Sequence, residues 1–190
     1  MNDEELIKQY NGNWANISIN SELNEDFINK YADKIIWHLL LVKQKLSSKC
    51  IDQNMIYIKP DKPHPVNITD STLNKIKIAA KRRYSNADNN WKLIELYQRL
   101  DGWFLHKYAN SFEFRTILNV QKVPYDFILK HIDKIKKLNL INVVCVQQNV
   151  TDEFIIKYSS YLTSSDIQLI IDKNKIQHTE NINILKLKLI

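Results

Sequence analysis

Glycine is nearly absent from this sequence, which has only Gly12 and Gly102 among 190 residues. Phosphate-binding loops need several closely spaced glycines, because the backbone must come near the phosphate oxygens. Two glycines so far apart form neither a P-loop nor a dinucleotide-binding fingerprint. The commonest nucleotide-binding classes are therefore excluded, and we expect no cofactor.

Cysteine and long apolar runs are also scarce. Cys50 and Cys145 are the two cysteines, and the acidic N-terminal segment MNDEELIKQY is unlike a secretory signal. We therefore expect free thiols in a reducing, intracellular compartment. The longest apolar run, residues 35–42, is much shorter than the roughly 18 residues that a membrane-spanning helix needs, so we predict no membrane span.

Arginine is rare too. Only four of the 27 basic residues are Arg, whereas Lys, Asn and Ile are abundant. Residues with AT-rich codons have replaced those with GC-rich codons, as in the genomes of large DNA viruses, phages and some microbes. A lysine in such a sequence is weak evidence for an acidic ligand.

What the sequence does contain is an internal repeat of 23 to 27 residues in about six degenerate copies. Each copy has an aromatic or aliphatic residue, a Leu, Val or Ile nine residues later, and in most copies a Phe-Ile or similar pair four residues after that. Gln44, Gln98, Gln121 and Gln148 stand two residues before the Leu or Val. Lys followed by Tyr or His comes three residues after the Phe position.

The spacing predicts a hairpin of two short helices in each copy. Asn24 and Thr151 are typical N-caps followed by acidic residues, and Pro124 takes the cap position in the fourth copy. A second helix is expected to begin near Asp33, Asp88, Ser111 or Ser165. Short helices are marginal alone, so neighbouring hairpins must stack and bury their apolar faces. The expected repeat core is Trp14, Trp37, Trp91, Phe27, Phe104, Phe127 and Phe154.

The predicted fold class is therefore mainly α, an array of helical hairpins with one interruption and one or two short β-strands. We expect N-terminal repeats over residues 1–50, an insertion or degenerate repeat over 51–90, C-terminal repeats over 91–182 and a strand over 183–190, all in one compact unit. Met55–Ile58 is the other expected strand, because β-branched residues precede a proline-rich segment. The C-terminal strand pairs with it or with another chain.

Residues 72–84 are predicted to form a basic helix inside the interruption. Its densest charge is Lys75, Lys77, Lys81, Arg82 and Arg83. Such a patch is able to hold phosphates, and a second basic run follows at Lys134, Lys136 and Lys137. The simpler interpretation is a solvated face in a lysine-rich chain, because no known nucleic-acid-binding motif accompanies it.

No catalytic or metal-binding constellation is recognisable. The five histidines are scattered, and none pairs with cysteine or carboxylate at metal-ligand spacing. Only His64, between two prolines, stands out. The recurring glutamines have two interpretations: a ladder that binds an extended ligand, or amides that close each hairpin through the backbone. We favour the second.

The segments Leu23–Tyr31, Trp37–Ser47 and Val150–Tyr158 resemble a short helical repeat of uncharacterised proteins in giant DNA viruses and large phages. The resemblance covers residues 14–47 and 91–182. It implies a viral or phage source and a helical array, but no catalytic residue.

Our first hypothesis is a non-enzymatic protein–protein interaction or structural protein, acting as a virion component or a host-interacting scaffold in the virion or host cytoplasm. Its alternative is a nucleic-acid-binding protein that uses helix 72–84. An enzyme is the least favoured class, because it would need carboxylates that converge with His64.

Overall fold

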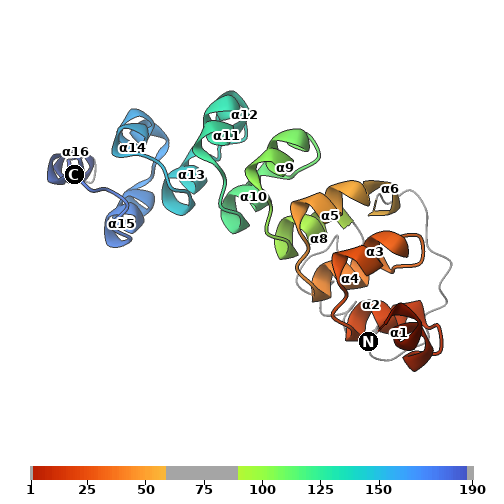
Figure 1. The fold of residues 1–190 in the computed structure, drawn as a ribbon. Helices are drawn as coiled ribbons and strands as arrows, with labels where there is room; N and C mark the ends of the chain where they lie inside the picture. The colour runs from red at the N-terminus through yellow and green to blue at the C-terminus, as the bar shows by residue number, and fades with distance from the viewer. Residues whose placement is uncertain (1, 59–89, 188–190) are drawn as a thin grey trace. The chain divides into compact units, whose positions relative to one another are not determined.

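The computed structural model describes residues 2–58 and 90–187 (Figure 1). Within these ranges the chain consists of helices and turns, with no β-strand. The predicted mainly α fold is therefore confirmed. The chain divides into two compact units, which we call the N-terminal unit (Met1–Phe104) and the C-terminal unit (Leu105–Ile190). Their boundary falls inside α9 (Gly102–Lys107).

Two kinds of helix alternate in the N-terminal unit after α1 (Asp3–Gln9). The A helices, which begin at or near the recurring Trp position, are α2 (Trp14–Asn20), α4 (Trp37–Lys43) and α8 (Asn90–Tyr97). The B helices, which follow a cap, are α3 (Glu25–Lys30) and α5 (Ser48–Gln53), and α6 (Met55–Ile58) comes after them. α4 packs between α2 and α8, and α3 packs against α5.

The C-terminal unit continues the alternation. Its A helices are α10 (Phe114–Val120), α13 (Ile141–Gln147) and α15 (Ser164–Asp172). Its B helices are α11 (Tyr125–Lys130), α14 (Asp152–Lys157) and α16 (Thr179–Lys186), with α12 (Ile132–Lys137) and a 3-10 turn (Ser159–Tyr161) as extra elements. α13 packs between α10 and α15, and α14 packs against α16. Figure 1 shows α11 and α14 on one side of the α10–α13–α15 row.

The B helices begin where the sequence places caps. The Asn24 side-chain oxygen accepts the Phe27 N–H at 2.7 Å, and the Thr151 hydroxyl accepts the Phe154 N–H at 3.2 Å. Pro124 takes the N-cap position of α11 and leaves no side-chain cap there. These contacts satisfy amide donors that a helix cannot pair internally, so the predicted caps at Asn24 and Thr151 are confirmed.

Most of the expected core residues are buried. Trp37, Phe27, Phe104, Phe127 and Phe154 lie in the interior, where each such side chain contributes about 1.5–3 kcal/mol through apolar burial.

Trp14 and Trp91 are only half-buried. The Trp14 ring packs beside the rings of Phe27 and Tyr31, with centroid distances of 6.1 and 5.3 Å.

Some A helices begin later than predicted. α4 begins at Trp37 rather than near Asp33, and α10 begins at Phe114 rather than near Ser111. In the first case Lys34 and Ile35 donate their N–H groups to the Tyr31 carbonyl, so this segment extends the end of α3 as a turn. Asp88 lies outside the described residues.

Both strand predictions are wrong where the structure describes them. Met55–Ile58 is a helical turn, α6, whose buried residues Met55 and Ile58 are spaced i, i+3. Residues 183–187 continue α16, in which Leu185 is fully buried whereas Ile184 is largely exposed. In both segments the burial of apolar side chains fits a helix, and this burial outweighs the sequence patterns that predicted strands. Residues 188–190 lie outside the described part.

Candidate functional site

The predicted basic patch, Lys75, Lys77, Lys81, Arg82 and Arg83, lies entirely outside the described residues. The second basic run is in α12, where part of it contacts the protein itself. The Lys134 ammonium lies 4.1 Å from the centre of the Phe114 ring, and Lys136 lies 3.5 Å from the Asp133 carboxylate. These lysines are therefore partly engaged in packing.

His106 and His131 both lie beside the Phe127 ring, whereas His178 lies beside Asp152. His106 Nε2 lies 3.0 Å from the Asp126 carboxylate, and His131 packs against the Phe127 ring. Burial lowers the pKa of His131, and nearby Lys130 and Lys134 lower it further. His64 lies outside the described residues. In the described ranges no group of three His, Cys, Asp or Glu side chains is placed to hold a metal ion.

Both thiols are fully buried. Burial raises the pKa of Cys50 to about 11 and that of Cys145 to about 12, so neither forms appreciable thiolate at neutral pH. We expect iodoacetamide at pH 8 to alkylate them at least tenfold more slowly in the native protein than in urea, as measured by mass spectrometry. Rapid alkylation of the native protein would contradict this burial.

The recurring glutamines join successive segments of the chain. Gln148 accepts the Val123 N–H at 2.9 Å and donates to the carbonyls of Leu118 and Gln121 at 2.5 and 2.9 Å. Gln98 makes the equivalent set: it accepts from the Leu46 N–H and donates to the Leu41 and Gln44 carbonyls.

Gln44 makes a similar contact with an earlier segment: its amide accepts the Leu23 N–H and donates to the Leu23 carbonyl. Each of these amides therefore bonds the backbone of an earlier segment. We had expected each glutamine to close its own hairpin, and this expectation is wrong. Gln98 and Gln148 are buried. The ligand-binding interpretation of the glutamines is thus wrong for these residues.

The first residue of several B helices makes a second cross-contact. Glu25 accepts hydrogen bonds from the backbone and hydroxyl of Ser47, the cap of α5, at 2.8 and 2.9 Å. Ser48 in turn accepts the Asp101 N–H at 2.8 Å, just before α9. Sequence reasoning had assigned the first-turn acids only to caps and helix dipoles, because a local pattern does not show which distant amide a side chain reaches.

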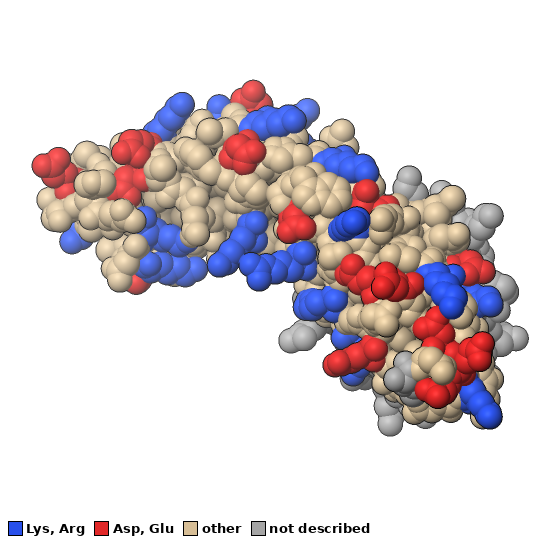
Figure 2. All heavy atoms as spheres, viewed as in Figure 1, with Lys and Arg blue, Asp and Glu red and all other residues tan. Residues whose placement is uncertain are grey.

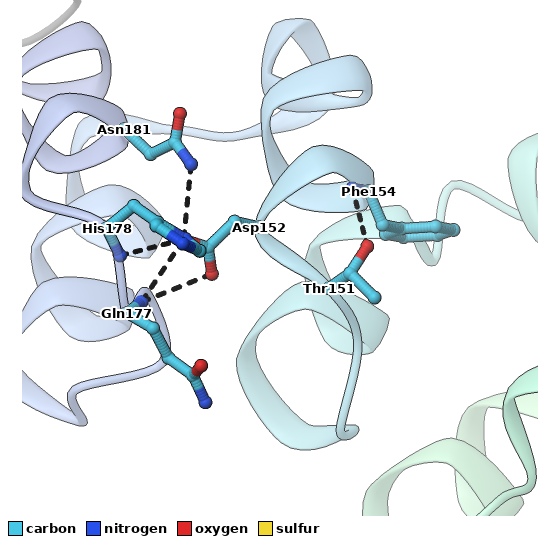
Figure 3. A network of polar contacts seen from close by, with 6 residues as sticks. All are labelled: Thr151, Asp152, Phe154, Gln177, His178 and Asn181. Atoms are coloured by element: carbon cyan, nitrogen blue, oxygen red, sulfur yellow. Dashed lines mark hydrogen bonds and ion pairs between the residues drawn. The ribbon is translucent and has the colours of Figure 1, made fainter.

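Asp152 is the most connected of these residues (Figure 3). It is the first residue of α14, and its buried carboxylate points toward the start of α16. It accepts the backbone N–H groups of Gln177 and His178, the Asn181 amide at 3.1 Å and the His178 Nδ1 at 2.8 Å. Asp152 therefore holds the segment that leads into α16, from another helix.

Two opposing effects set the pKa of Asp152. Burial alone would raise it, but the hydrogen bonds from His178, Asn181 and Gln177 stabilise the anion and bring the pKa down to about 2. The carboxylate is therefore charged at neutral pH. His178 is 70% exposed at its side chain and contributes one N–H to this network. The arrangement joins α14 to the start of α16 (Figure 3).

The N-terminal unit has a hollow of about 280 Å³ beside α1. Its lining includes apolar Leu6 and Leu23, the Tyr10 ring, and the polar side chains of Ser21 and Glu22. The Ser21 Oγ is buried and has no hydrogen-bond partner among the described residues. Asn11 and Gly12, with φ of 50° and 68°, turn the chain from α1 into α2 and so place α1 against this hollow.

Acidic residues surround the hollow. The first 26 residues carry six carboxylates and one lysine, although the whole chain has a net charge of +6. Figure 2 shows acidic side chains gathered over the part of the N-terminal unit that carries α1 and α3, with some lysines among them. Asp3 is paired with Lys30 at 2.7 Å, whereas Glu22 is exposed and has no ion pair within the described ranges.

None of the helices described is long and apolar enough to cross a membrane. No family model matches the sequence, and neither the curated proteins nor the solved structures include a significant match.

Proposed function

We propose that this chain is an array of helical-hairpin repeats that binds another protein and has no enzymatic role. The support is a contrast between buried and exposed positions of the predicted copies. The buried positions mostly keep their character, because the contacts between successive segments use the same glutamine and apolar positions in most of the copies. The exposed positions differ, as in repeat proteins whose surfaces recognise extended partners.

The second residue of the B helices carries this proposal. α16 departs from the pattern, because the half-buried Asn181 follows Glu180 there. The second residue is exposed in the other B helices α3, α5, α11 and α14 and also in α9, which we group with them; these residues are Asp26, Lys49, Asp126, Glu153 and Trp103. The next residue is buried in every case and is Phe in all but one. An exposed position that varies in charge and size beside a position that stays buried is typical of a binding surface rather than of a stacking contact. Trp103, 47% exposed, is the residue best suited to a protein contact.

The sequence resemblance supports a large DNA virus or phage as the source, with the protein as a virion component or a host-interacting scaffold. A nucleic-acid partner is the alternative, and it would use the basic segment outside the described residues. Affinity capture with and without nuclease separates these two functions.

The test is capture of the tagged full-length protein from its native context, with mass spectrometry. We expect a protein partner that survives nuclease treatment and is lost or strongly reduced with Trp103→Asp. Lys107→Asp, at another exposed position of α9, is the matched control. Recovery of nucleic acid, with all proteins lost after digestion, would replace this proposal by the alternative.

A further inference from the structure

We propose that the hollow beside α1 is a pocket for one arginine side chain of a partner protein. This inference rests on the proposed protein-binding function and names the chemistry of one contact. The pocket lies within the N-terminal unit, between α1 and the turn from α2 to α3.

The hollow exists because a recurring side chain is missing. Ser21 is the residue that follows α2, as Gln44 follows α4 and Gln148 follows α13. Those glutamines extend toward the preceding segment and fill the space there with an amide that makes two or three hydrogen bonds. The segment that precedes Ser21 is α1, and the short serine side chain does not reach across to it.

The polar groups of the hollow are suited to a cationic donor. The Ser21 Oγ is a buried polar atom without a partner in the described residues, and it gains a hydrogen bond if its hydroxyl turns toward a donor in the hollow. Glu22 supplies a carboxylate that no described residue neutralises, and a guanidinium binds such a group with two parallel hydrogen bonds. Lys43 and Lys45 line a separate hollow with Glu22, on the side of α4.

The apolar walls are suited to the rest of an arginine side chain. Leu6 and Leu23 offer aliphatic surface to its methylene groups, and the half-buried Tyr10 ring offers a face on which a planar guanidinium stacks. Lysine lacks both the planar fork and the stacking surface, so it fits less well. The surrounding carboxylates of α1 and α3 attract a cation and repel an acidic partner.

The hollow is large enough for one side chain. Its volume of about 280 Å³ lies near the lower end of the range of about 300–1,000 Å³ that is usual for ligand pockets. One arginine from an extended segment fits in it, and the flanking residues of that segment would remain on the surface.

The experiment titrates the blocked peptide acetyl-Gly-Arg-Gly-amide into the isotope-labelled full-length protein at low salt and follows amide shifts by NMR. We expect saturable shifts of the amides of Tyr10, Ser21 and Leu23. The corresponding lysine peptide should bind several-fold more weakly, and the citrulline peptide, which keeps the shape but not the charge, should cause no saturable shift.

Two variants test the pocket itself. Ser21→Gln restores the recurring residue and should weaken the arginine peptide by about tenfold or more by occupying the hollow. Glu22→Gln removes an exposed carboxylate without a risk to the fold and should weaken it several-fold. Glu4→Gln makes the same charge change on α1 outside the lining and should leave the binding unchanged.

Equal binding of the arginine and citrulline peptides, or equal weakening by Glu22→Gln and Glu4→Gln, would overturn the pocket. The same variants, used in the capture experiment, separate the two proposals. If partner proteins are captured while the peptide causes no saturable shift of these amides, the pocket is wrong and the scaffold stands. If no partner protein is captured while the arginine peptide binds as expected, the scaffold is wrong and the pocket stands.

Discussion

Replacing Gln148 by alanine is expected to lower the free energy of unfolding of the C-terminal unit by about 3 kcal/mol, because it leaves three buried backbone groups without partners. The Val123 N–H and the carbonyls of Leu118 and Gln121 all bond this one amide. These three residues are themselves buried, so water does not readily replace the lost bonds. The loss uncouples α13 from the segment that begins at α10.

Urea unfolding followed by circular dichroism measures this change, and amide hydrogen exchange locates it. We expect the protection of the Val123 amide to fall more than that of the α13 interior. Gln147→Ala is the matched control, because Gln147 is exposed and belongs to the same helix, and its effect should stay within about 0.5 kcal/mol. Equal stability of the two variants would show that the amide contact contributes nothing.

Replacing Asp152 by alanine is the second large change, and we expect it to detach and unfold α16. The carboxylate accepts hydrogen bonds from four donor groups at the start of this helix, and the Gln177 N–H is shared between its two oxygens. Bonds to a charged acceptor contribute more than neutral ones, and a helix of eight residues is marginal without tertiary contacts. The expected loss is about 2–3 kcal/mol, with exchange protection lost over Thr179–Lys186 and kept in α13. Asp133→Ala, at an exposed carboxylate of α12, is the control.

The same anchor has a defined dependence on pH. The pKa of Asp152 is about 2 in the folded protein and 3.8 for an ordinary aspartate, so the anion is stabilised by folding. This contribution is fully present above pH 4 and is lost as the pH falls toward 2. We expect the protection of α16 to decrease in that interval in the wild-type protein and to stay uniformly low with Asp152→Ala. Constant protection of the wild-type helix down to pH 2 would contradict the anchoring role.

Features that depend on neighbours along the chain are readable from the sequence. Asn24 and Thr151 cap helices because their side chains reach an amide three residues away, whatever the rest of the fold does. Phe27 and Phe154 are buried because they stand at helical spacing on the apolar face of these helices. The mainly α class follows from the same local periodicity, and the absence of glycine-rich phosphate loops follows from the glycine content.

Features that depend on distant partners are not readable in this way. The recurrence of Gln98 and Gln148 is evident, yet the partner of Gln148 lies 25 residues away in the sequence and that of Gln98 lies 52 residues away. The acid at Asp152 looks like any first-turn acid until α16 is in place beside it. Alternating apolar residues near the C-terminus predict a strand, but Leu185 is buried at helical spacing once this anchor exists.

The hollow at Ser21 shows both contributions. The sequence by itself determines that a small serine stands where other predicted copies carry glutamine, and that acidic residues crowd the first 26 positions. Only the tertiary structure decides that α1 turns back to leave a space there, with the Ser21 hydroxyl buried and without a partner among the described residues. The physical reason is the distance along the chain over which each effect acts. Propensity, capping and apolar periodicity act over about one helical turn, whereas cavities and cross-helix hydrogen bonds exist only after distant segments have packed.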